Sequence, residues 1–185
     1  MTIRKDDLDA VRAFIEKDRA ESGSKGGPWF SIKEDGEHEI RIIKLAEFKT
    51  GTHWGVIEGK EGKSKSIRCP RVLNSQPCPI CERIEELRES DDPEDQERAE
   101  KIMAQEKYPI VVLDMQETSP EPRIYEASKS VFYGIWDLIA SKSGSYKDLL
   151  SLERGRNVII ERDSKKKGKK WIDYKVVPCP DRSEV

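Results

Sequence analysis

The stretch HWGVIEGKEGKSKSIRCPRVLNSQPCPIC, residues 53–81, decides how part of this chain must fold. It contains His53, Cys69, Cys78 and Cys81, with 15, 8 and 2 residues between successive members. The last pair forms a CxxC loop, in which two thiolates from one turn can bind the same Zn²⁺. Four protein ligands in a tetrahedral arrangement leave no position for water or substrate. We therefore predict a structural zinc site, and we expect function to come from the surface around it.

The cysteine motif leaves two alternatives open. The fourth ligand is His53 in our interpretation, because His38 lies in a charged segment ahead of the first predicted strand. CPIC is also a dithiol redox motif, although no thioredoxin-like βαβ pattern surrounds it here. Cys179 is far from the other three cysteines in the sequence, and we expect it to stay outside the cluster.

Composition narrows the class of protein. The 185 residues suffice for one domain with a real core, and they are 35% hydrophobic and 38% charged. No apolar run approaches the roughly 18 residues of a membrane span, and the N-terminal MTIRKDDLDA is charged where a signal peptide is apolar. We expect a soluble, cytoplasmic protein without membrane contact, in the host cytoplasm if the chain is viral. In a reducing compartment a CxxC favours metal over a disulfide.

The net charge of −2 conceals a strong segregation of charge. Residues 82–107 carry 11 acids and 5 bases, whereas residues 154–175 carry 9 bases and 3 acids. Residues 41–71 carry 8 bases and 3 acids. A local basic face, rather than the net charge, sets the attraction for nucleic acid. For any one of these runs, a solvated surface is an equally good explanation.

Hydrophobic periodicity predicts a mainly β chain with helical insertions. An amphipathic helix at 5–21 and a Gly/Ser linker form an N-terminal segment, 1–27. The predicted strands cover 39–45, 52–58, 64–69, 109–115, 123–127, 157–162 and 171–177, and the further helices cover 82–89, a segment from 93 to about 106, and 130–141. We interpret residues 28–180 as a five-stranded oligonucleotide-binding (OB-fold) barrel with an inserted zinc-binding subdomain at about 53–107, followed by a short tail, 181–185.

Aromatic residues alternate with basic ones in several predicted strands. A cationic groove binds the phosphates of a single strand, and flat rings stack on its unpaired bases at about 1–3 kcal/mol per base. The candidates for such contacts are Trp54, Arg68, Arg71, Arg123, Tyr125, Lys129, Lys165, Lys166, Lys167, Lys169, Lys170, Trp171 and Tyr174. We expect Phe132 and Trp136, on the last predicted helix, to belong to the core instead.

Two of these groups have alternatives. Trp171 and Tyr174 are three positions apart, so they face opposite sides of a strand and only one can line the groove. The lysines of residues 165–170 either clamp phosphates or form a solvated hairpin tip. We favour the clamp, because an anion would relieve the repulsion between so many like charges.

The order His, Cys, CPxC, inserted between strands of a barrel, resembles the zinc-containing single-stranded-DNA-binding (helix-destabilising) proteins of T4-type phages. The segments SKSVFYGIWDLI, GRNVIIERD and WIDYKVVPCP extend the resemblance over roughly residues 28–180. It implies Zn²⁺ bound by His53, Cys69, Cys78 and Cys81, and replication proteins as partners. The family's basic N-terminal arm and acidic C-terminal tail have no counterpart in this sequence, so cooperative self-association on DNA is not carried over and the oligomeric state stays open.

We therefore predict a protein that coats single-stranded DNA without sequence preference in DNA replication, recombination and repair, with RNA as an open alternative. We expect no enzymatic activity, because the sequence has no GxxxxGK[ST], GxSxG or HExxH motif. The alternative is a zinc-knuckle protein-interaction module of a replication or transcription complex, docking through residues 82–107. A nuclease with scattered acidic ligands is a third hypothesis, which Mg²⁺-dependent cleavage of an oligonucleotide would support.

Overall fold

The computed structural model describes residues 2–3, 28–58, 64–141, 144, 146–165 and 172–182. The chain divides into two compact units. Unit 1 comprises Met1–Glu47 and Tyr108–Val185, and unit 2 comprises Phe48–Lys107. The helix predicted at residues 5–21 lies outside the described residues, as does nearly all of the linker after it.

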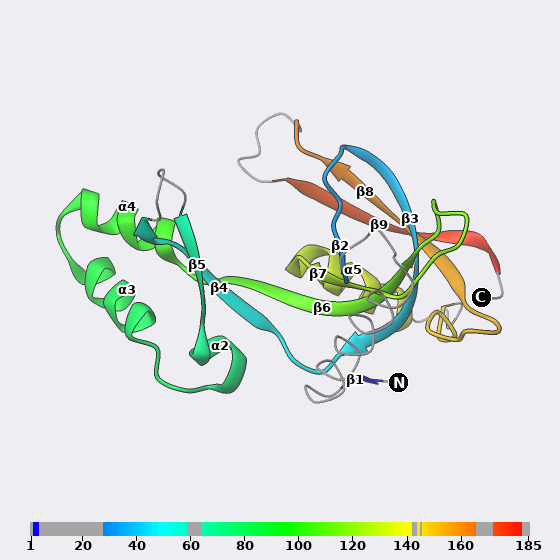
Figure 1. Cartoon of the computed structure of the whole chain (residues 1–185), viewed down its shortest axis with the longest axis horizontal. Coiled ribbons are helices and arrows are strands. Elements are labelled where there is room, and N and C mark those ends of the chain that lie inside the picture. The colour runs from blue at the N-terminus through cyan, green and yellow to red at the C-terminus, as the bar shows by residue number, and fades with distance from the viewer. Residues whose placement is uncertain are drawn as a thin grey trace, which may run out of the picture. The chain divides into compact units, whose positions relative to one another are not determined.

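Unit 1 is a largely antiparallel β-sheet (Figure 1). Its strands are β1 (Thr2–Ile3), β2 (Trp29–Phe30), β3 (Gly36–Ala46), β6 (Gln105–Asp114), β7 (Arg123–Ala127), β8 (Arg156–Asp163) and β9 (Asp173–Arg182). They lie in the order β2-β7-β6-β3-β8-β9, and β1 pairs in parallel with β3. The long strand β3 pairs with β6 at one end and with β8 at the other, so it joins the two halves of the sheet.

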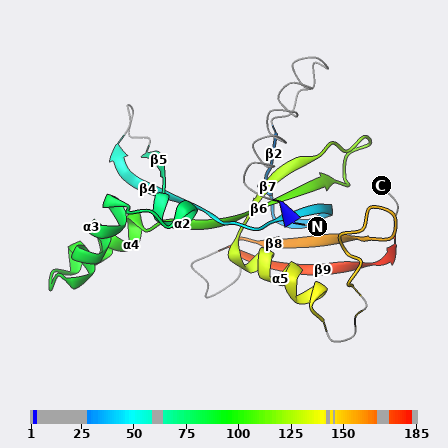
Figure 2. The same cartoon turned by 90° about the horizontal axis from the view of Figure 1, so that it is seen from below.

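One helix, α5 (Lys129–Ile139), covers the core of this sheet and lies beside β9 (Figure 2). Its buried residues are Val131, Phe132 and Ile135, which pack into one cluster with the buried aliphatic residues of β3, β6 and β8. Ser128 caps the helix by accepting a hydrogen bond from the Val131 N–H. Gly134 allows the close approach, because a Cβ there would lie 2.9 Å from Val176 Cγ2 on β9.

The prediction of a mainly β fold with helical insertions is confirmed, whereas closure into a five-stranded barrel stays a prediction. Five strands lie in the order β7-β6-β3-β8-β9, and α5 falls between β7 and β8 in the sequence. In the part of the chain that the structure describes, no ladder joins β9 to β7. The edge of β7 that does not face β6 pairs instead with β2, through Trp29↔Ile124 and Phe30↔Tyr125.

The described residues of unit 2 form a β-hairpin and three helices. These elements are β4 (Thr50–Glu58), β5 (Ser64–Arg68), α2 (Pro70–Asn74), α3 (Pro79–Glu89) and α4 (Pro93–Ile102). The first residues of β6 also belong to this unit and pair with β4, at Thr50↔Lys107. Figure 1 shows α3 and α4 as a helical hairpin, and their contact buries Ile84, Leu87, Ala99 and Ile102. Unit 2 therefore has a small apolar core of its own.

Candidate metal centre

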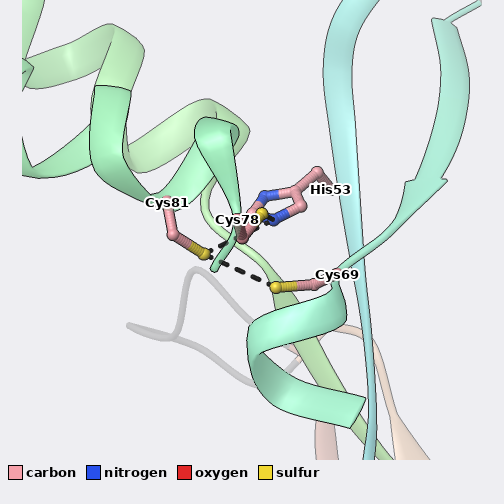
Figure 3. A group of neighbouring side chains, drawn as sticks. All are labelled: His53, Cys69, Cys78 and Cys81. Carbon is pink, nitrogen blue, oxygen red and sulfur yellow. Dashed lines mark hydrogen bonds between the residues drawn. The ribbon is translucent and has the colours of Figure 1, made fainter. Parts of the chain in front are cut away.

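Three short elements bring the predicted ligands together. His53 lies on β4, Cys69 immediately precedes α2, and Cys78 and Cys81 lie at the start of α3 (Figure 3). Cys69 and Cys78 each stand before a proline, which disfavours helical backbone at the preceding residue. Their φ/ψ values are accordingly extended, at −89°/111° and −132°/109°. Each proline then begins a helix, at a position where no N–H is needed, so each Cys-Pro pair places a thiol at a helix start.

The four ligand atoms lie within 4.8 Å of one another. His53 Nε2 is 3.5 Å from Cys78 Sγ and 3.6 Å from Cys81 Sγ, and the sulfurs of Cys69 and Cys81 are 3.5 Å apart. A tetrahedral Zn²⁺, bound at about 2.3 Å from sulfur and 2.0–2.1 Å from nitrogen, holds its ligand atoms about 3.5–3.8 Å apart. All three cysteines are free thiols, and only Cys81 has appreciable exposure. The donor set and its spacing therefore fit a structural metal ion.

The ring of His53 is oriented by a second contact. Its Nδ1 lies 2.8 Å from the carbonyl oxygen of Ile102, the last residue of α4. Because a carbonyl oxygen only accepts, Nδ1 carries the proton and Nε2 presents its lone pair to the cysteines. Metal-bound histidines almost always donate their other ring N–H in this way. His53 is thus arranged as a ligand.

The thiols of Cys78 and Cys81 differ in acidity. Burial and, to a smaller extent, the neighbouring thiols of Cys69 and Cys78 together raise the pKa of the Cys81 thiol to about 12. Burial also disfavours the Cys78 thiolate, but hydrogen bonds from the backbone N–H of Cys81, the thiol of Cys81 and the backbone N–H of Ile80 lower the pKa of Cys78 to about 7. The two thiols together therefore lose one proton readily and resist losing the second. A cation between the sulfurs would remove this resistance.

The remaining candidate ligands, His38 and Cys179, lie in unit 1. His38, on β3, has its Nε2 2.9 Å from the carbonyl oxygen of Glu34. Cys179, on β9, points its thiol toward the Glu39 carboxylate at 3.8 Å. Neither belongs to the cluster that the described residues form. The structure therefore favours His53 as the fourth ligand, and Cys179 stays outside the cluster.

Two of the predicted nucleic-acid contacts share one face of the β4–β5 hairpin. Arg68 on β5 pairs with Thr52 on β4, and its Nη1 is 3.4 Å from the Thr52 hydroxyl. Because side chains alternate along a strand, Trp54 lies on the same face as Thr52, opposite to His53. The Trp54 side chain is 44% exposed, whereas His53 is fully buried. The hairpin therefore turns its histidine to the metal cluster and its tryptophan to solvent.

Other predicted contacts are engaged elsewhere. Arg71, on α2, forms an ion pair with Glu85 of α3. Arg123 binds the Glu117 carboxylate through Nη2, which lies 2.6 and 2.8 Å from its two oxygens. Tyr174 is half-buried against the unit 1 core. These side chains are therefore less available for contacts with single-stranded nucleic acid than their residue types alone suggest.

Tyr125 corrects one prediction. It is 6% exposed, its ring stands edge-on to that of Phe30 at 5.4 Å between centroids, and burial raises the pKa of its hydroxyl. A ring inside the core is not available to an unpaired base. Lys129 and Lys165, by contrast, are exposed. The remaining predicted contacts, Lys166, Lys167, Lys169, Lys170 and Trp171, lie outside the described residues.

Two rings on α5 are exposed, although the sequence analysis named neither of them as a surface residue. Tyr133 is 48% exposed and Trp136 38% exposed, and the Lys129 amine lies 5.9 Å from the centre of the Tyr133 ring. Phe132 is buried as predicted, but Trp136 is not. The signal was available, because Trp136 is one residue from the buried Ile135 and hence about 100° around the helix from it.

Comparison of the chain with protein-family models, with curated proteins and with solved structures found no match. Function must therefore be argued from the geometry of the chain itself. Among the described residues, no helix combines the length and the apolar character needed to cross a membrane.

Proposed function

We propose that this chain binds single-stranded DNA, and that Zn²⁺ at His53, Cys69, Cys78 and Cys81 stabilises the part that does so. The observation that carries this proposal is the alternation at two adjacent residues of β4: His53 is fully buried in the cysteine cluster, and Trp54 is 44% exposed. A metal bound at His53 would fix the strand next to the indole ring. A ring held in this way loses little conformational freedom when a base stacks on it.

The surroundings of Trp54 suit the rest of a nucleotide. Arg68, on the same face, supplies a cation for phosphate, and Thr52 supplies a hydroxyl beside it. The ladder is interrupted just after His53, where Gly55 has a φ of 72° that other residues rarely adopt. A ring and a cation together bind any base and its phosphate without reading the base edge. We therefore propose binding without sequence preference.

We further propose that unit 1 is an oligonucleotide-binding barrel of the five-stranded, partly open kind. The support is its strand order, β7-β6-β3-β8-β9, with α5 between β7 and β8 in the sequence. In this proposal the chain binds and does not catalyse. The resemblance to T4-type phage single-stranded-DNA-binding proteins, with roles in replication, recombination and repair, stays our hypothesis for its family.

Titration of tryptophan fluorescence with a dT oligonucleotide, poly-U and duplex DNA tests the proposal. We expect binding to dT in preference to duplex DNA, with log K falling by about 0.7 per log unit of salt for each phosphate bound. Replacing Trp54 by alanine should weaken dT binding roughly fivefold or more, because stacking is worth about 1–3 kcal/mol. Trp29→Ala is the comparison variant, since Trp29 is similarly exposed, at 43%, but lies on β2 and not on β4.

Three results would contradict the proposal. An affinity for dT that does not change with salt concentration would exclude contacts to the phosphates. Equal affinity of the wild type and Trp54→Ala for dT would exclude a stacking contact on β4. Absence of binding to every nucleic acid would favour binding of a protein partner as the function.

A further inference from the structure

Unit 2 contains a pocket beside its small core, since Leu87 and Ile102 of that core line it. The pocket has a volume of about 200 Å³, and its apolar lining includes Val56, Ile80, Leu87 and Ile102. Pockets for drug-sized molecules are larger, at about 300–1,000 Å³. Among the residues that the structure describes, no aromatic ring and no carboxylate lines this pocket, so its floor suits an aliphatic side chain better than a planar or cationic group.

The charges at the pocket differ from those of the segment around it. Residues 82–107 carry 11 acids and 5 bases, yet the charged residues that line the pocket are two arginines, Arg83 and Arg98. Arg83 pairs with Glu86 at 2.7 Å on the exposed surface of α3. Arg98, on the exposed side of α4, makes no ion pair or hydrogen bond with any residue that the structure describes. Positive charge is therefore concentrated at this pocket within an otherwise acidic segment.

We propose that this pocket binds a segment of a partner protein that carries one aliphatic side chain next to one or two carboxylates. The aliphatic side chain contacts Ile80, Leu87 and Ile102, and the carboxylate pairs with Arg98 and Arg83. Burial of apolar surface supplies most of the affinity, and the arginines select an acidic neighbour over a basic one. The proposal does not depend on DNA binding.

A nucleic-acid strand fits this pocket poorly. It has a phosphate at every nucleotide, so a strand that placed one phosphate at Arg98 would bring the next ones to the acids of α3 and α4. Like charges repel at such distances, and the aliphatic lining offers no ring for stacking. A peptide with a single carboxylate avoids this repulsion, which is why a protein segment is the favoured occupant.

Fluorescence anisotropy with the full-length chain and three labelled, end-blocked peptides tests the proposal. The probe is Ser-Gly-Asp-Leu-Leu-Gly-Ser, and the controls replace both leucines by serine or the aspartate by asparagine. We expect the serine peptide to bind at least about tenfold more weakly, because a buried leucine side chain contributes about that factor or more. The asparagine peptide should bind up to roughly fivefold more weakly, as expected for an exposed ion pair.

The matching protein variants are Arg98→Gln and, as a control, Lys101→Gln. Both residues are exposed on α4, but Lys101 pairs with Glu97 and does not line the pocket. We expect Arg98→Gln to bind the aspartate peptide up to roughly fivefold more weakly and to lose the preference for aspartate over asparagine. Lys101→Gln should behave as the wild type, and equal zinc content and melting temperature in all three proteins would exclude a folding defect.

Four outcomes would overturn the proposal. The first is equal affinity for the leucine and serine peptides, and the second is equal affinity of Arg98→Gln and Lys101→Gln for the aspartate peptide. If Arg98→Gln weakens binding of a dT oligonucleotide but not of the peptide, the pocket serves nucleic acid. If Arg98→Gln abolishes a concentration-dependent dimer while no peptide binds, the occupant is a second copy of this chain.

Discussion

The ring of His53 and the backbone carbonyl of Ile102 form the hydrogen bond that joins the metal cluster to the end of α4, at 2.8 Å. The side chain of the same Ile102 is 7% exposed and packs with Leu87 and Ala99 in the small core of unit 2. One residue therefore takes part in both the proposed metal centre and the apolar core. We expect loss of either to weaken the other.

His53→Ala should lower zinc affinity by at least about tenfold, since even loss of a group that orients a metal ligand costs 10–100-fold. His38→Ala is the matched control, because His38 is the only other histidine and lies outside the cluster. Competition with a chromogenic chelator measures both affinities. Equal affinities for the two variants would exclude His53 as a ligand.

Removal of zinc by a chelator should unfold unit 2 before unit 1. Among the described residues, the apolar core of unit 2 consists of Ile84, Leu87, Ala99 and Ile102, with Val56 and Ile80 packed against it, whereas the core of unit 1 is much larger. A core of that size gives little stability without the metal. Hydrogen exchange should show α3 and α4 losing protection while β3 and β8 keep theirs. Uniform loss across both units would contradict this expectation.

Zinc affinity should rise with pH, because the ion binds thiolates and displaces their protons. At about pH 8 the Cys78 thiol, with its pKa lowered to about 7, is already ionised, whereas Cys81, with its pKa raised to about 12, still holds a proton. Below about pH 7 both thiols are protonated, so each ion bound releases one more proton. Affinity measured between about pH 6 and pH 9 should therefore fall more steeply on the acid side. A flat profile would argue against thiolate ligands.

Gly51→Ala should weaken the metal site through the backbone. A Cβ at Gly51 would lie 2.7 Å from Val72 Cβ on α2, and the Gly51 carbonyl accepts the Cys69 N–H at 2.9 Å. The expected cost is about 1–3 kcal/mol, as for other overpacked sites. Gly134→Ala is the comparison, since its clash with Val176 lies in unit 1. We expect it to lower the melting temperature of unit 1 while zinc affinity is unchanged.

The metal cluster could be predicted from the sequence because its geometry is local. Proline after Cys69 and Cys78 sets an extended residue and then a helix start, and CxxC spacing places Cys81 in the first turn. The start of β6 could not be predicted in this way. Its first residues, from Gln105 to Lys107, are polar and become a strand by pairing with Thr50–Thr52, which are distant in the sequence.

The candidate binding residues were harder to predict, because burial depends on what covers each face. On β7 both Ile124 and Tyr125 are buried, so both faces of that strand are covered and alternation does not identify an exposed ring. On α5 Trp136 lies at the edge of the apolar stripe, one residue after the buried Ile135, and it is exposed. The hydrophobic character of tryptophan predicts that Trp136 lies in the core, whereas its angular position on the helix predicts that it is exposed. The structure agrees with the angular position.

The two exposed rings of α5 can be compared directly with Trp54 of β4. Tyr133 and Trp136 belong to unit 1 and Trp54 to unit 2, so single variants show which unit carries stacking contacts. Each ring that stacks on a base should cost about 1–3 kcal/mol when replaced by alanine. We expect Trp54→Ala to weaken dT binding only while zinc is bound, because the metal fixes β4. Trp136→Ala should weaken it by a factor that a chelator does not change. If Trp54→Ala does not weaken dT binding while zinc is bound, the binding site lies entirely in unit 1.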